Sequence, residues 1–590
     1  VLSTNTTGAD NTAVGYIALN ANTTGANNTT VGAYSLDSNT TGAQNSALGN
    51  QVLAANTTGG YNTGVGYNVL TKNTTASSNT ALGANAAEET TTGANNTAIG
   101  KSALATNTTG SANVAVGAIA LDANTTGDYN TSIGYESLSA NTTADSNTGL
   151  GSFTLRYNTT GANNTATGYK ALEANTTGTQ CTAIGYQALG AHTTGYGNVA
   201  VGYLSQPATT TGNYNTGVGL QSLRTNSTGT RNVAIGTNAM ELNTTGGDNV
   251  AIGMGALEQN TTASQNTAVG YEALEENTTG PNNTAVGFHA LTANTTAEGN
   301  HAFGTWALYN NTTGEHNTAI GRSTLFNNTT GSYNVSMGRN ALSGNTTADN
   351  NTAVGYYALG ACTTGTSNVA FGAFAGDAIT TGGGNTQIGY WAGSTHTTAN
   401  HNTNVGYYSG WAITSGYQNT TLGAYTGYVI TTGLNNTFVG YEAGNNTSPS
   451  GAVTTGSNVV CLGNNSVSSL YCADTSISSS DKRDKTDVVD FTNGLNWVNQ
   501  LKPVTYRWDK RAWYDDNTPD GSKKRNKKHI GFLAQDVLAI EGNPSDKDDM
   551  LVVNLNEDDT AYGLKYERLV PVLVNAIKEL SAKVTALEAK

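Results

Sequence analysis

The sequence predicts an all-β chain: a trimeric parallel β-solenoid, or β-roll, shaft followed by a C-terminal α+β domain that ends in a coiled-coil helix. A 17-residue motif recurs over most of the 590 residues. Charged residues make up only 11% of the chain, against about 25% in typical soluble domains. Of the 26 Lys and Arg residues, eighteen lie in the segment 481–590, so the composition changes near residue 480.

The repeat reads Asn-Thr-Thr-Gly-x-x-Asn-Thr-Ala-Val-Gly-Tyr-x-Ala-Leu-x-x, and its residues are numbered here as positions 1 to 17. The first complete copy begins at Asn5 and the last regular copy at Ile430, and 25 periods separate these starts without an insertion. Position 11 is Gly in all 26 copies, and position 3 is Thr in every copy but one, where Ser415 stands. An uninterrupted period is typical of stacked coils, because an extra residue would break the ladder.

Local patterns within the motif predict two short strands and two turns per repeat. Asn-Thr-Ala-Val and Tyr-x-Ala-Leu both alternate in polarity or size, as strands with one buried face do. The invariant Gly predicts either a positive φ or a backbone approach too close for a Cβ atom. The two Asn positions favour turns, and stacked Asn side chains can form ladders. The Asn-Thr-Thr sequons are therefore interpreted as structural elements rather than as glycosylation sites.

One coil of the repeat is too small to enclose Val, Tyr and Leu together, so one apolar row is expected to pack against other chains in a homotrimer. The regular β-forming residues argue against disorder. The pattern resembles the β-roll heads of trimeric autotransporter adhesins, whose period is shorter. A triple β-spiral is the alternative: stacked coils advance about 4.8 Å per repeat, or roughly 125 Å for 26 copies, and a spiral would be far longer.

The expected domains are a shaft at 1–456, a neck or tip at 457–479 and a C-terminal domain at 480–590. The chain begins inside a repeat, so an attachment part is expected to be missing. Cys181 and Cys362 replace Asn at repeat positions, whereas pairing of Cys461 with Cys472 is left open. No apolar run is long enough to span a bilayer, and no basic footprint marks a nucleic-acid site. No cofactor or metal is expected.

The segment 480–590 differs from the shaft in carrying mixed charge and a heptad-like ending. Apolar residues there are spaced 3, 4, 4, 3, 4, 3, which predicts a coiled-coil helix at about 564–590, with one helix packed on its own domain as the alternative. The seam consists of Tyr566, Leu569, Leu573, Ile577, Leu580, Val584 and Leu587.

Four stretches of this domain resemble the C-terminal intramolecular chaperone domain of endosialidase-type phage tailspikes, a self-cleaving peptidase family. They are Ser480-Asp-Lys-Arg-Asp-Lys485, Leu501-Lys-Pro-Val-Thr-Tyr-Arg-Trp508, His529-Ile-Gly-Phe-Leu-Ala-Gln-Asp-Val537 and Leu564-Lys-Tyr566.

The resemblance implies a Ser/Lys dyad, with Ser480 as nucleophile, Lys485 as general base and cleavage between Ser479 and Ser480. A lysine can act as a base only where burial lowers the pKa of its ammonium group well below about 10.4. Burial on trimerisation would meet that condition. His529 and Gln535 lie in a motif of the family and are candidates for support of catalysis, although structural hydrogen bonding is an equal alternative.

The implied function is a structural and adhesive phage tail fibre in the virion, whose C-terminal domain drives trimerisation and leaves by autoproteolysis. Its expected partners are a host-surface receptor, either a polysaccharide or an outer-surface protein, and virion tail proteins. The alternatives are a bacterial surface adhesin at the cell surface, an ice-binding fibre, or a tailspike that degrades polysaccharide. The last would need two carboxylates at a defined separation, whereas acidic residues of the shaft are scattered.

Overall fold

The computed structural model describes residues 1–470, 485–511, 514, 516, 518–555 and 561–590. The chain divides into two compact units, Val1–Thr347 and Ala348–Lys590. Both units contain coils of the same kind, and the second also contains the C-terminal domain.

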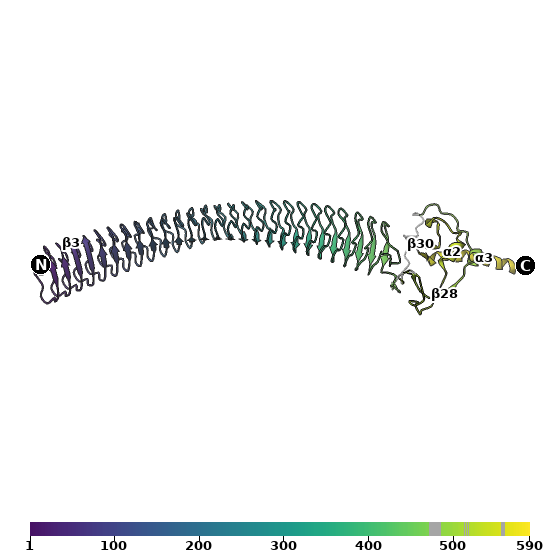
Figure 1. The fold of residues 1–590 in the computed structure, drawn as a ribbon, viewed down its shortest axis with the longest axis horizontal. Helices are drawn as coiled ribbons and strands as arrows, with labels where there is room; N and C mark the ends of the chain where they lie inside the picture. The colour runs from purple at the N-terminus through teal and green to yellow at the C-terminus, as the bar shows by residue number, and fades with distance from the viewer. Residues whose placement is uncertain (471–484, 512–513, 515, 517, 556–560) are drawn as a thin grey trace. The chain divides into compact units, whose positions relative to one another are not determined.

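The first unit consists of twenty coils, each with one strand that lies beside those of its neighbours (Figure 1). The strands are β1 (Thr12–Val14), β2 (Thr29–Val31), β3 (Ser46–Asn50), β4 (Thr63–Tyr67), β5 (Thr80–Leu82), β6 (Thr97–Ile99), β7 (Val114–Val116), β8 (Thr131–Ile133), β9 (Thr148–Leu150), β10 (Thr165–Thr167), β11 (Thr182–Ile184), β12 (Val199–Val201), β13 (Thr216–Val218), β14 (Val233–Ile235), β15 (Val250–Ile252), β16 (Thr267–Val269), β17 (Thr284–Val286), β18 (His301–Phe303), β19 (Thr318–Ile320) and β20 (Val335–Met337).

The second unit begins with seven further coil strands and ends with a small α+β domain. The coil strands are β21 (Thr352–Val354), β22 (Val369–Phe371), β23 (Thr386–Ile388), β24 (Thr403–Val405), β25 (Thr420–Leu422), β26 (Thr437–Val439) and β27 (Val460–Leu462). The domain contains α1 (Leu495–Val498), β28 (Val504–Tyr506), β29 (His529–Gly531), α2 (Ala534–Ile540), η3 (Lys547–Asp549), β30 (Val553–Leu555), β31 (Tyr562–Leu564), η4 (Tyr566–Arg568) and α3 (Leu569–Glu588).

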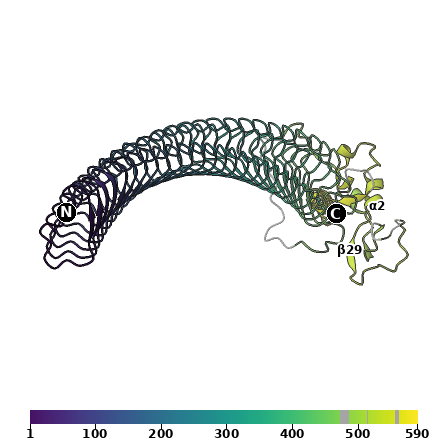
Figure 2. The same ribbon diagram turned by 60° about the vertical axis from the view of Figure 1, so that its left-hand side comes forward.

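Successive strands of the shaft pair in parallel with a register of one repeat. In the first unit, for example, Thr182 of β11 pairs with Val199 of β12, and Ile184 with Val201. The turns of chain in this unit have similar outlines, as Figure 2 shows. Direct pairing of neighbouring repeats confirms the parallel β-solenoid and excludes a β-spiral, in which repeats are farther apart along the axis.

In most coils the interior holds small side chains and one Leu. Position 9, the middle of the strand, and positions 14 and 15 point inward, so Ala47, Ala18 and Leu19 are buried. Positions 10 and 12 point outward: Val14 and Tyr16 are 58% and 66% exposed. This confirms that one coil does not enclose Val, Tyr and Leu together.

The two Asn positions form buried ladders along the stack. At position 1, the Asn39 side-chain amide donates to Asn22 Oδ1 at 2.8 Å and to the Gly42 carbonyl at 2.9 Å. At position 7, the Asn45 backbone N–H donates to Asn28 Oδ1 at 3.0 Å. Polar groups inside the coil are shielded from water, and leaving them without a hydrogen-bond partner would cost free energy. The ladders supply these partners. Buried position-1 Asn side chains have no room for a glycan, in line with a structural role for the sequons.

The invariant Gly at position 11 satisfies both conditions expected from sequence. Gly117 has φ of 137°, and a Cβ atom there would lie 2.5 Å from the Gly134 carbonyl oxygen of the next coil. A side chain would therefore strain the backbone and collide with the neighbouring coil. Glycine is therefore the only residue that fits position 11 without strain.

Replacing Gly117 by Ala should destabilise its coil by about 3 kcal/mol or more, because φ strain and overpacking add. Hydrogen exchange of amides in the flanking coils measures the loss. The matched control is Gly110→Ala at position 4, where a Cβ atom would lie equally close to the next coil, 2.5 Å from the Gly127 carbonyl oxygen, but φ is not positive and Ala76 and Ala144 stand in other coils. Equal losses in the two variants would contradict the role assigned to position 11.

The second segment of the repeat is not a strand, so the expectation of two strands per repeat is wrong. In the segment Tyr-x-Ala-Leu, Ile17 and Leu19 have positive φ of 56° and 50°. The segment still bonds to both neighbouring coils: the Tyr34 N–H donates to the Tyr16 carbonyl of the previous coil at 2.9 Å, and the Leu36 N–H to the Val52 carbonyl of the next coil at 2.9 Å. In this conformation two successive side chains, Ala18 and Leu19, are both buried, so the segment does not alternate between faces as a strand does.

Substitutions in the Asn ladders place cysteine and histidine inside the coil. Cys181, Cys362 and Cys461 are free and buried, and Cys472 lies outside the described residues. His192 replaces Asn at position 1: its Nδ1 lies 2.9 Å from Asn175 Oδ1, and its Nε2 lies 3.2 Å from the Asn198 amide nitrogen. A neutral imidazole with a proton on Nδ1 donates to the first and accepts from the second.

These buried histidines make shaft stability fall with acid. Burial lowers the pKa of His192, and that of His396 in the second unit, to about 4. Because the unfolded imidazole has a pKa near 6.5, stability is retained above about pH 6.5 and declines as pH falls toward 4, by about 3 kcal/mol per histidine. Thermal unfolding between pH 7.5 and 4 measures this decline.

Restoring the ladder residue with His192→Asn should remove that histidine's share of the pH dependence. The control is His316→Asn, because the His316 side chain is exposed. A pH profile that is unchanged in His192→Asn would contradict the assignment.

The C-terminal domain contains two two-stranded sheets and three α-helices, with one small core. β28 pairs with β29 and β30 with β31, both antiparallel. Leu564 ends a strand and η4 follows it, so α3 begins at Leu569 rather than near residue 564. The core consists of Trp497, Val537, Leu538, Met550, Val552, Val553, Leu569 and Val572.

Candidate functional site

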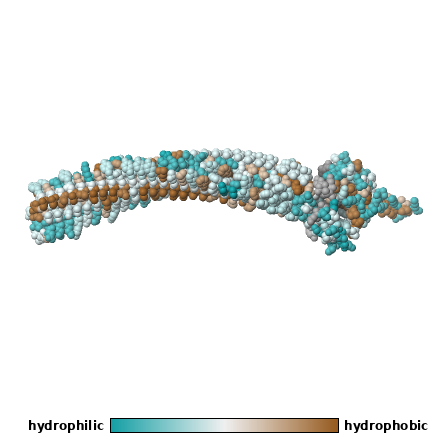
Figure 3. Space-filling model, viewed as in Figure 1, coloured by the Kyte–Doolittle hydropathy of each residue, from teal (hydrophilic) through white to brown (hydrophobic). Residues whose placement is uncertain are grey.

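The outward face of the solenoid strands is an exposed apolar surface of the shaft. Position 10 carries Val, Ile, Leu, Met or Phe in 26 of the 27 coil strands, with Thr167 the exception. These side chains stand outside the coil, as at Leu48 and Leu82, which are 45% and 46% exposed. Figure 3 shows an apolar stripe along the first unit. We call this column the strand face.

No charged residue interrupts the strand face. The charged residues of 1–470 occupy positions 5, 6, 12, 13, 16 and 17, and none occupies positions 7 to 11 in any coil. The titratable side chains on these strands are His301 of β18, Cys461 of β27 and Tyr67 at the end of β4. A long apolar strip that excludes charge marks a surface that another molecule covers.

The predicted cleavage junction is only partly within the described residues. Ser479 and Ser480 lie outside them, and Lys485 is the first described residue that follows. The Lys485 side chain is exposed in the single chain. Burial of this amine would therefore need further chains, which is consistent with chemistry that starts only after assembly.

His529 and Gln535 lie on different elements of the C-terminal domain. His529 begins β29, where its ring stacks on Tyr506 of β28 with 5.5 Å between centroids. Gln535 is the second residue of α2 and is exposed. This packing of His529 against an aromatic neighbour suits a structural role, while Gln535 is accessible to another chain.

The remaining motif residues join the sheet to the last helix. The Phe532 N–H donates to the Tyr566 hydroxyl at 3.0 Å. A Cβ atom on Gly531 would lie too close to that hydroxyl, so glycine makes room for it. These contacts of Gly531 and Phe532 with Tyr566 hold the end of β29 against η4, which directly precedes α3.

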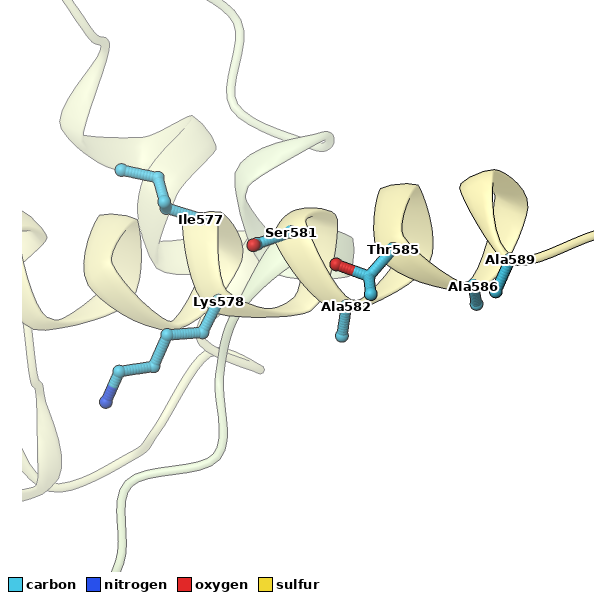
Figure 4. Close-up of a pocket in the computed structure, with 7 residues that line it drawn as sticks. All are labelled: Ile577, Lys578, Ser581, Ala582, Thr585, Ala586 and Ala589. Carbon is cyan, nitrogen blue, oxygen red and sulfur yellow. The ribbon is translucent and has the colours of Figure 1, made fainter.

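Helix α3 is packed at its beginning and exposed at its end. Leu569, Val572 and Ala576 are buried against the domain. Along the predicted seam, Ile577 and Leu587 are 66% and 71% exposed. Small side chains line a shallow face of the same segment, and Figure 4 shows Ala582, Ala586 and Ala589 along it. The second half of α3 thus leaves apolar residues exposed in the single chain.

One group of described residues could hold a cation. Glu298, Glu315 and His316 come from adjacent coils, and their ligand atoms all lie within 4.8 Å of one another. Glu298 and His316 are exposed. The described residues contain no helix long and apolar enough to cross a bilayer.

An aromatic cluster in the second unit was not singled out by the sequence analysis. Eleven Tyr, Trp and Phe rings lie at positions 12, 13 and 16 between residues 356 and 441, and we call them the aromatic face. The signal was present in the sequence: the three coils with a pair of Tyr or Trp residues at positions 12 and 13 are all here, at Tyr356-Tyr357, Tyr390-Trp391 and Tyr407-Tyr408.

Comparison with known families matches one part of the chain. Residues 480–545 match the family described as chaperone of endosialidase. Comparison with curated proteins and with solved structures gave no match. A chaperone of this family at the C-terminus of a long parallel β-solenoid fits a tailspike or fibre with a C-terminal chaperone domain.

Proposed function

We propose that this chain is a homotrimeric phage tail fibre that attaches the virion to a host surface, and that its C-terminal domain assembles the trimer and then releases itself by autoproteolysis. The observation that carries the proposal is the chaperone match at one end of a solenoid with a charge-free apolar strand face. The family implies trimerisation, and the strand face supplies a surface for it.

Register explains why such a fibre needs a chaperone. Neighbouring repeats are nearly identical, so a shift of one chain by a single repeat replaces almost every contact by an equivalent one. Weakly specified registers slip, and contacts between distant segments form slowly. Three C-terminal domains that associate first would align the chains before the shafts pair. The exposed second half of α3 supplies a seam for that association.

Sedimentation of the purified protein tests assembly, and binding of labelled protein to bacterial cells tests attachment. We expect a trimer at micromolar concentration and saturable binding to the host cell. Antibody labelling in electron micrographs should place the chain on virion tails. A monomer would overturn the assembly part of the proposal, and labelling of bacterial surfaces in uninfected cultures would overturn the virion assignment.

A further inference from the structure

The aromatic face consists of rings that stack along the second unit as well as within single coils. Tyr390 and Tyr407, at position 12 of neighbouring coils, stack with 5.7 Å between centroids and 13° between planes. At position 13, Tyr408 and Tyr425 of neighbouring coils also stack, with 5.7 Å between centroids and 13° between planes. At position 16, Trp411 stacks on Tyr428 of the next coil.

The columns also contact one another, which fixes the rings in place. Tyr390 stacks on Trp391 with 5° between planes, and Tyr407 meets Tyr408 edge to face at 4.6 Å between centroids. The position-12 rings remain accessible: Tyr390 and Tyr407 are 42% and 45% exposed. Rings held by their neighbours lose little freedom when a ligand binds, so less binding energy is lost to ordering.

The coil does not need these rings for its own folding. Position 12 is Ala in five coils, two of them within the aromatic face, at Ala373 and Ala424. The rings also lie outside the coil interior, which is filled by positions 1, 7, 9, 14 and 15. An aromatic cluster that its scaffold does not require marks a binding surface.

The charge around the aromatic face selects among ligands. No Lys or Arg stands between Arg339 and Lys482, so an anionic polymer would find no basic partner. Asp377 Oδ1 accepts a hydrogen bond from the Ser394 hydroxyl, and Glu442 from the Thr447 hydroxyl. The available polar groups are then mainly tyrosine hydroxyls, which both donate and accept hydrogen bonds.

We propose that the aromatic face binds an uncharged saccharide chain. The C–H faces of a pyranose ring carry partial positive charge and stack on the negative face of an aromatic ring, while the sugar hydroxyls exchange hydrogen bonds with tyrosine. A platform that repeats with every coil suits a polymer of repeating units. This inference rests on the proposed attachment function, because the saccharide would be the host receptor to which the fibre attaches.

Affinity electrophoresis of the full chain in native gels that contain dextran, mannan or laminarin tests the proposal, with anionic alginate for comparison. We expect at least one of the three neutral polymers to retard the protein. The double variant Tyr390→Ala and Tyr407→Ala should bind that polymer about tenfold more weakly. Tyr67→Ala should bind it as the wild type does, because Tyr67 occupies position 12 of the first unit and is 53% exposed.

Three results would overturn the saccharide site: retardation by none of the neutral polymers, retardation by alginate alone, or undiminished binding in the double variant. A changed sedimentation coefficient in the double variant would also overturn it, because the rings would then pack between chains. Cell binding separates the two proposals. If the protein binds a neutral polymer through these rings but adheres to no host cell, the attachment function fails and the saccharide site stands.

Discussion

Ser480→Ala should leave the expressed chain intact, whereas the wild type should give a shaft that ends at Ser479 and a separate fragment that spans 480–590. Without its hydroxyl, position 480 has no nucleophile to attack the preceding peptide bond. Mass spectrometry of the two new ends measures the result. Folding should survive, because one hydroxyl at the junction is not part of the trimerising surface.

Lys485 offers a sharper version of the same experiment. Lys485→Arg keeps the positive charge, but a guanidinium cannot be deprotonated in a protein and so cannot act as a base. We therefore expect no cleavage in Lys485→Arg or in Lys485→Ala. Ser479→Ala should be cut normally. Undiminished cleavage in Ser480→Ala, or any cleavage in Lys485→Arg, would show that the dyad is assigned wrongly.

Much of the shaft could be predicted from sequence because its period restricts the geometry. A strict and uninterrupted period favoured stacked coils, with a triple β-spiral as the alternative, and Gly at position 11 predicted either a positive φ or a close approach of neighbouring backbones. A coil too small to enclose Val, Tyr and Leu together was expected to leave one apolar row outside, but the sequence did not show which row. In the structure Leu19 is buried, and Val14 and Tyr16 lie outside.

The segment Tyr-x-Ala-Leu could not be predicted correctly from its alternation alone. Alternating polarity requires only that successive side chains point to opposite sides. In the structure the successive residues Ala18 and Leu19 are both buried, and the positive φ of Ile17 and Leu19 departs from an extended backbone. The hydrogen bonds to neighbouring coils that stabilise this conformation are not visible in one repeat.

The candidate sites differ in how far the sequence determines them. Ser480 and Lys485 follow from a motif, and only the Lys485 side of the dyad lies within the described residues. The aromatic face depends on departures from the repeat rather than on its consensus. Tyr at position 12 is common along the shaft, and single rings occur at positions 13 and 16 elsewhere, so the aromatic residue at position 13 of five successive coils distinguishes residues 356–441.

Charge placed on the strand face should prevent the shafts from associating. The variant carries Asp at position 10 of four successive coils, in place of Val218, Ile235, Ile252 and Val269. If this face lies between chains, a trimer would bury twelve carboxylates without partners, each at a cost of several kcal/mol. The coil interior is untouched because position 10 points outward.

Sedimentation of the released shaft measures this effect, with circular dichroism as a check that the coils remain folded. The matched control carries Asp at position 12 of the same coils, in place of Leu220, Thr237, Met254 and Tyr271. Position 12 already carries charge at Lys101 and Arg322, so the control should remain trimeric. A trimeric shaft with four Asp residues on the strand face would place the contact between chains elsewhere. Slower cleavage in the strand-face variant would in addition link burial at the junction to assembly of the shaft, because Lys485 is exposed in the single chain.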